Sequence, residues 1–228
     1  MSQLEVFPRR TMRHNSQHDN SGSHGIPAGA DCWYTAAAML TGFLGVSSGE
    51  DDAVDAIKEA MEGDGRTSPF REFLRGARHG HLLRRRDRLA VAGEFGALFL
   101  AWYLKPHGMR VIWSPGYRDL AAVGAIARAN DLPLLVAQDW SGTELQARAR
   151  EGSPAILSTM ATSSGHYVAV SGVWERDGEP AGLRIEDSHG RYPYMSRSAS
   201  GAANLHSWEA LAAMRKNLGW RYVQVCPS

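Results

Sequence analysis

The chain has 228 residues, of which 43% are hydrophobic and 21% charged, and its formal net charge is +1. A composition this apolar excludes an intrinsically disordered protein, and the length is sufficient for a substantial core. The balanced charge does not favour nucleic acid or a membrane surface as a partner. Two cysteines are too few for a disulfide framework in a chain of this size, although they allow one bridge.

Membrane insertion and secretion through a signal peptide are not expected. The longest apolar stretch, residues 95–104, is about half of the roughly 20 residues that a membrane-spanning helix requires. The first residues are polar and lack the apolar segment of a secretory signal. We therefore expect a cytoplasmic protein, or one that is exported by a route independent of a signal peptide.

The first half of the chain is expected to be mostly helical. Residues 1–30 are polar and aperiodic, which predicts a loop or extended segment with a flexible arm over 1–16. The arginine-rich stretch 65–91 has no pattern that assigns it. Helices are predicted from about Cys32 to Gly42 or Gly45 and over 49–61, 94–105, 118–130 and 142–150, with short strands over 110–113 and 134–137.

From residue 153 the hydrophobic period changes to two, which is typical of strands. Strands are predicted over 154–159, 166–174, 183–187 and 220–226, and a helix over 208–218. Helices in the first half and antiparallel strands in the second indicate an α+β fold. No repeat or low-complexity linker divides the chain, so we expect a single domain over 1–228, in which 43–150 is a mainly helical region without a recognisable motif.

Cys32 is the first candidate for chemistry because it lies where the first long helix should begin. Unsatisfied backbone N–H groups and the positive end of the helix dipole stabilise a thiolate there. Asp31 opposes thiolate formation through its negative charge, so a nucleophilic Cys32 needs a base. A buried, inert thiol is the structural alternative.

His166 is the best candidate base, and Asp187 the best candidate for orienting it. Alternation in the strand over 166–174 places His166, Val168 and Val170 on one face. Asp177-Gly178 is a strong two-residue hairpin turn, and pairing about that turn brings residue 187 to within about two positions of the histidine. Each residue alone has a structural explanation, but a helix-start Cys, a strand His and a hairpin-paired Asp in this order favour a catalytic triad.

Two segments resemble papain-like cysteine peptidases of the bacteriocin-processing type. QHDNSGSHGIPAGADCWYTAAAML is similar to the segment of that family that carries the nucleophile. GSPAILSTMATSSGHYVAVSGV resembles its Gly-x-Pro strand followed by Gly-His, and LRIEDSHG resembles its Asp-Pro-Gly ending, with Ser188 in place of proline. The resemblance covers residues 17–42 and 152–190, and loosely 207–225.

The resemblance implies a papain-like fold and cysteine peptidase activity without a metal or organic cofactor. It also implies that the side chain of Gln17 and the backbone N–H of Cys32 hold the oxyanion, whereas Gln17 on its own is an ordinary polar loop residue. The expected substrate is a peptide, or a peptidoglycan-like cross-link if the protein is an antibacterial amidase. Acyl transfer by the same triad and an inert papain-like binding module remain open alternatives.

Other patterns are weaker candidates for function. Gly45-Val46-Ser47-Ser48-Gly49 matches G-x-S-x-G but follows a helix, whereas a nucleophile elbow needs a strand before it. His79 and His81 lack further ligands at zinc spacing, and Cys226 ends an apolar strand. The arginine cluster over 71–88 is either a solvated surface or a docking face for an acidic partner. His189 is a possible pocket residue beside Asp187.

Overall fold

One mixed sheet organises the part of the chain that the computed structural model describes, which is residues 3–17, 31–64, 67–82, 94–115, 121–159, 165–190, 202–213 and 220–227. Its order is β3-β2-β8-β4-β5-β6-β7, and β1 pairs with β5 beside this path. The strands are β1 (Leu4–Phe7), β2 (Met109–Pro115), β3 (Leu134–Val136), β4 (Ala155–Thr159), β5 (His166–Arg176), β6 (Glu179–Glu186), β7 (Asn204–Ser207) and β8 (Arg221–Pro227).

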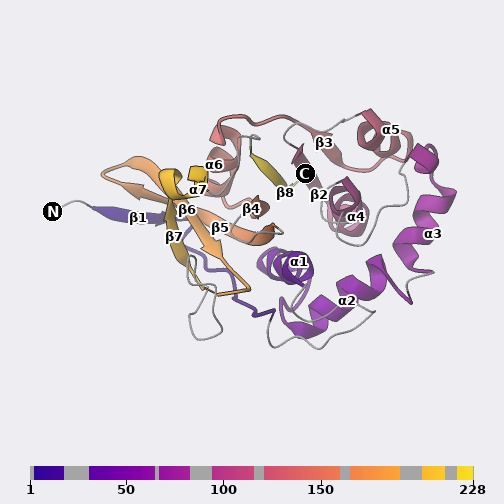
Figure 1. The fold of residues 1–228 in the computed structure, drawn as a ribbon, viewed down its shortest axis with the longest axis horizontal. Helices are drawn as coiled ribbons and strands as arrows, with labels where there is room; N and C mark the ends of the chain where they lie inside the picture. Colours follow the sequence, from indigo (N-terminus) through magenta and orange to yellow (C-terminus); the bar gives the residue numbers. More distant parts are fainter. Residues whose placement is uncertain are drawn as a thin grey trace.

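Helices lie on both faces of this sheet (Figure 1). They are α1 (Cys32–Phe43), α2 (Asp51–Met61), α3 (Pro69–Gly76), α4 (Glu94–Leu104), α5 (Ala121–Ala129), α6 (Thr143–Arg150) and α7 (Trp208–Ala213), with 3₁₀ turns η2 (Gly80–Leu82) and η4 (Lys105–His107). The α+β prediction is therefore confirmed. None of the described helices is long and apolar enough to cross a bilayer.

The alternation of strand residues divides the core into two layers. Ile156 on β4 and Ala169 on β5 belong to the larger apolar cluster, which contains α1, α2, α4 and α5. Their neighbours Leu157 and Val168 belong to the cluster on the other face, which contains residues of α6 and α7. Helix α1 consequently lies inside the molecule, against β4 and β5 on one side and α2 on the other (Figure 1).

The β5–β6 hairpin has the register expected from its turn. Asp177 and Gly178 both have positive φ, 55° and 83°, as a type I′ turn requires. Two bulges interrupt the ladder, yet Ala169 still pairs with Glu186, as it would in a regular hairpin folded about that turn, because the second register shift cancels the first. The start of β5 and the residue after β6 therefore meet at one end of the sheet.

The structure corrects the prediction of a flexible arm over 1–16. Residues 4–7 form β1, which pairs antiparallel with residues 173–176 of β5, and Met12 is buried in the core. The partner strand lies far away in the sequence, so the local polarity that suggested an arm carried no information about this pairing. Within the mainly helical region 43–150, the short strands predicted over 110–113 and 134–137 are confirmed as β2 and β3, which form a parallel pair in the sheet.

Two further elements were not assigned from the sequence. Helix α3 begins with Ser68 as its N-cap, whose side chain accepts from Arg71 N, and with Pro69 at the first helical position. Strand β7 pairs with β6. The predicted extensions of helices over 118–120 and 214–218 lie outside the described residues.

Gly96 on α4 provides a test of the packing beside α1. A Cβ at this position would lie 2.8 Å from Cζ2 and 3.0 Å from Nε1 of Trp33, whose buried ring packs against Phe99. Gly96→Ala should therefore lower the free energy of unfolding by about 1–3 kcal/mol, despite the roughly 0.5–1 kcal/mol that alanine normally adds inside a helix.

Gly124→Ala on α5 is the matched control, measured by the same urea denaturation. The three atoms nearest to its Cβ would all belong to the guanidinium group of Arg128, with Nη1 closest at 3.2 Å, and the end of that side chain can move. The Gly124 variant should be as stable as the parent protein or more stable. Equal losses in the two variants would contradict this description of the α1–α4 contact.

Candidate active site

The proposed nucleophile occupies the position expected from the sequence. Cys32 is the first residue of α1, and its side chain is partly buried. The helix forms here because alanines 36–38, Met39 and Leu40 are strong helix formers, and all five are buried. The thiol is thus held at the positive end of a helix that the core fixes in place.

His166 brings the three predicted residues together. Its Nε2 lies 2.7 Å from Oδ1 of Asp187, and its ring also interacts with the Cys32 side chain. His166 is the first residue of β5 and Asp187 directly follows β6, and each is only 2% exposed. With Nε2 directed at the carboxylate, Nδ1 is the ring nitrogen available to exchange a proton with the thiol.

The pKa of His166 is raised to about 9 by its two partners. Burial alone lowers the pKa, because a charged ring is poorly solvated in the interior. Hydrogen bonds to Asp187 and Cys32, together with their negative charges, outweigh that effect. At neutral pH the imidazole therefore carries the proton.

Asp187 is fixed from several directions. Its Oδ1 accepts a hydrogen bond from the backbone N–H of His189 at 2.9 Å, and Nε2 of His14 lies 3.1 Å from its main-chain oxygen. The backbone of the turn over 188–189 thus holds the Asp187 carboxylate, and His14, in the segment before α1, contacts the Asp187 main-chain oxygen. A carboxylate immobilised in this way can hold the imidazole in a single orientation.

Gln17 lies in the same cluster and is hydrogen-bonded to the turn that follows Asp187. It is 1% exposed, its backbone N–H donates to the main-chain oxygen of Ser188 at 3.0 Å, and its Oε1 accepts from the Ser188 hydroxyl at 2.8 Å. Its Nε2 is 3.0 Å from Nδ1 of His189, whose ring stands edge-on to His166 with centroids 5.8 Å apart. Segment 12–17 and turn 187–190 therefore form one hydrogen-bonded unit beside the triad.

Lys58 is a site residue that sequence reasoning missed. Its Nζ pairs with Oδ2 of Asp31, the residue before Cys32, and both side chains are fully buried. The pattern contained a signal, because Lys58 lies in the helical stripe of Val54, Ile57 and Met61, where an apolar residue is expected. Asp31 opposes the thiolate less than the sequence suggested, since an ammonium group neutralises it.

A second ionic group lies next to this pair. The hydroxyl of Tyr34 donates to Oε1 of Glu62 at 3.1 Å, and Glu62 also pairs with Arg71. Burial, with the adjacent Glu62 carboxylate, raises the pKa of Tyr34 far above its usual value, so this hydroxyl stays protonated. Both networks join the start of α1 to the helices that cover it.

The weaker candidates have structural positions. The segment 45–49 follows α1 directly, not a strand, which contradicts a nucleophile elbow, and the Ser47 hydroxyl bonds with that of Thr41. Cys226 is a buried residue of β8. In the arginine cluster Arg71 is paired with Glu62, and residues 83–88 lie outside the described residues.

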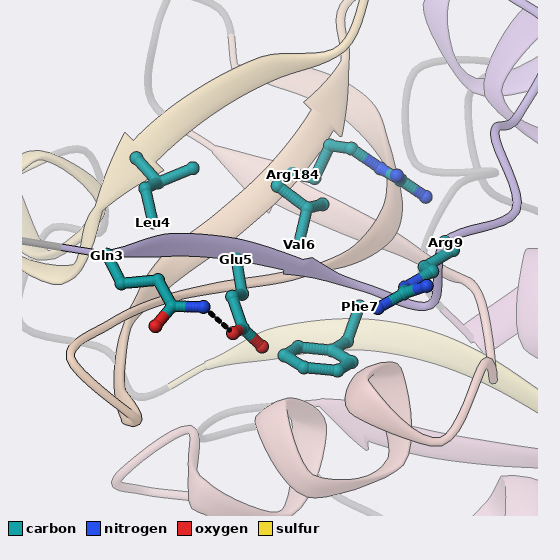
Figure 2. A pocket seen from close by; sticks show the side chains of 7 residues that line it. All are labelled: Gln3, Leu4, Glu5, Val6, Phe7, Arg9 and Arg184. Carbon is teal, nitrogen blue, oxygen red and sulfur yellow. Dashed lines mark hydrogen bonds between the residues drawn. The ribbon is translucent and has the colours of Figure 1, made fainter.

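Among the described residues no three His, Cys, Asp or Glu side chains form a group that could hold a metal ion, and His79 and His81 are without further ligands of that kind. Figure 2 shows a pocket of about 420 Å³ along β1 that contains none of the triad residues. It is lined by Gln3, Leu4, Glu5, Val6, Phe7, Arg9 and Arg184.

Comparison of the chain with family models, with characterised proteins and with solved structures finds no match.

The raised pKa of His166 predicts a pH-dependent contribution to stability. A group whose pKa rises from 6.5 to about 9 on folding stabilises the folded state fully below pH 6.5, and this contribution is lost as pH rises through about 9. Its size is about 3 kcal/mol. Relative to His166→Gln, the wild-type protein should therefore have its largest advantage in unfolding free energy near pH 6.

Urea denaturation of both proteins under reducing conditions, between about pH 6 and pH 10, measures this difference. A difference that stayed constant over this range would show that the His166 pKa is not raised.

Proposed function

We propose that the chain is a papain-like cysteine hydrolase that cleaves an amide bond, with Cys32 as nucleophile, His166 as acid and base, and Asp187 as the residue that orients the ring. The observation that carries this proposal is the single imidazole that contacts both the thiol and the carboxylate. In nucleophilic catalysis by cysteine, a base activates the thiol and a third group can orient that base, which is the arrangement of these residues.

The proposed reaction begins with the proton on His166. The Cys32 thiolate attacks the carbonyl carbon, and the carbonyl electrons move onto oxygen. When the tetrahedral intermediate collapses, the C–N bond breaks, and the imidazolium of His166 gives its proton to the departing amine, which leaves a thioester. A water molecule then gives a proton to His166 and attacks the thioester, the C–S bond breaks, and the acid product leaves with Cys32 again a thiolate.

The oxyanion has two proposed donors, Gln17 and the backbone N–H of Cys32. The N–H of the first helical residue has no acceptor within its own helix. The Gln17 amide nitrogen carries two hydrogens and lies 3.0 Å from Nδ1 of His189. Bonds to Ser188 and His189 would hold this amide in one orientation before substrate arrives, as efficient electrostatic stabilisation requires.

Thiol reactivity tests the proposal without knowledge of the substrate. Iodoacetamide should modify Cys32 selectively below neutral pH, because the imidazolium stabilises the thiolate, while buried Cys226 reacts slowly or not at all. In His166→Gln this selectivity should disappear. Peptide mapping by mass spectrometry identifies the modified residue, and a Cys32 that reacted only above about pH 8 would exclude the catalytic role and leave an inert binding module.

Turnover by variants tests the different roles of Cys32 and Asp187. Against a library of peptide amides and a peptidoglycan digest, Cys32→Ala should lower kcat/KM by about 10⁶-fold and Asp187→Asn by about 10⁴-fold, since the carboxylate only orients the base. Products analysed with and without added hydroxylamine distinguish hydrolysis from acyl transfer. Equal and complete losses in two folded variants would give Asp187 a role other than orientation.

Gln17→Ala should lower kcat by about 10²–10³-fold with KM nearly unchanged, because an oxyanion donor acts mainly in the transition state. Ser188→Ala is the matched control, since it removes one hydrogen bond to Gln17 and leaves its amide nitrogen in place. Its effect on kcat should be much smaller. Similar kcat in the Gln17 variant and the wild type would show that Gln17 only connects segment 12–17 to the turn.

A further inference from the structure

Lys58 and Asp31 form a buried ion pair that the triad itself does not require. Both side chains have no exposed surface, and Lys58 takes a core position on α2. Removing two charges from water is costly, and well-packed apolar residues of similar volume often stabilise a fold as well or better. A purely structural explanation therefore accounts poorly for a lysine at this position.

Asp31 does not serve the function that its place before a helix suggests. An aspartate there usually accepts a hydrogen bond from a backbone N–H of the first turn, but the Asp31 side chain makes no capping bond. Its main-chain oxygen accepts from the backbone N–H and the hydroxyl of Thr35, at 2.9 and 3.0 Å. The carboxylate is directed toward α2, where it meets Lys58.

The position of this pair relates it to the nucleophile. Asp31 is covalently adjacent to Cys32, so an uncompensated carboxylate would repel the thiolate in a medium that screens charge poorly. The ammonium of Lys58 neutralises the carboxylate and also anchors the residue from which α1 begins. The start of the helix is thereby held by α2, while the thiol contacts His166 on β5.

We infer that Lys58 is a positioning residue for Cys32, which holds and neutralises the Asp31 carboxylate so that the thiolate can form beside His166. This inference rests on the proposed function, because it assumes that Cys32 is the nucleophile. Several titratable or charged groups among the described residues face this end of α1. They are Asp31 just before α1 and Tyr34 in it, Lys58 in α2 and Glu62 just after it, and His166 on β5. Tyr34 stays protonated and Glu62 is paired with Arg71, so Asp31 and Lys58 are the groups whose balance a substitution changes.

The test is the rate of Cys32 alkylation by iodoacetamide as a function of pH, in a Cys226→Ser background with a single thiol. Lys58→Met leaves the carboxylate without its ammonium, so the midpoint of the rate profile should move up by about one pH unit. Asp31→Asn leaves the ammonium without its carboxylate, so the midpoint should move down. The double variant removes both charges and should return close to the wild-type midpoint.

Arg150→Met is the matched control, since it also leaves a buried carboxylate, that of Glu175, without its cation, but away from the start of α1 and with Asp31 and Lys58 in place. It should lower the unfolding temperature without moving the alkylation midpoint. Thermal unfolding of every variant identifies those that fold. If the single variants do not fold, the double variant alone tests the inference. A midpoint shift above half a unit in a folded double variant would overturn the inference.

Unchanged midpoints in folded single variants would also overturn it. Failure of the proposed function has a different signature, because Cys32 of the wild-type protein would then not react selectively below neutral pH. The two outcomes are therefore read from separate measurements on the same set of proteins.

Discussion

One imidazole, held between a thiol and a carboxylate, is the contact on which the proposed chemistry of this molecule depends. His166 is almost fully buried and would lose its charge in an apolar setting, but its bonds to Asp187 and Cys32 raise its pKa to about 9. The three residues come from the start of a helix, the start of a strand and the end of the next strand. The rest of the fold holds these three ends within hydrogen-bond distance.

The two sides of the site are held by different kinds of interaction. On the sheet side, the β5–β6 ladder sets the position of Asp187 relative to His166, and backbone and side-chain hydrogen bonds fasten Gln17 to the turn after Asp187. On the helix side, α1 is buried among apolar residues, and the buried Asp31–Lys58 pair connects its first turn to α2. Breaking such a pair by removing one partner typically costs about 3–5 kcal/mol, so the helix side tolerates little change at these residues.

Local patterns predicted the parts of the site that neighbouring residues specify. The alanine-rich stretch predicted where α1 begins, and the period of two predicted β5. Asp177-Gly178 predicted the register that brings Asp187 near His166, because a two-residue turn determines which residues pair. The α+β class followed from the same periodicities, while the role of Gln17 came only from a family resemblance and stays a prediction.

The sequence by itself therefore determined the α+β class, the helix that begins at Cys32, and the hairpin that pairs the strands of His166 and Asp187, since each depends on short-range periodicity and turn chemistry. Only the tertiary structure decided that the thiol reaches the imidazole, that residues 4–7 join the sheet, and that Lys58 is the partner of Asp31. These contacts join segments that are distant along the chain, and their geometry is set by the packing of whole elements against each other. In the sequence, Lys58 only interrupts an apolar helical stripe, and the fold shows that it pairs with the Asp31 carboxylate.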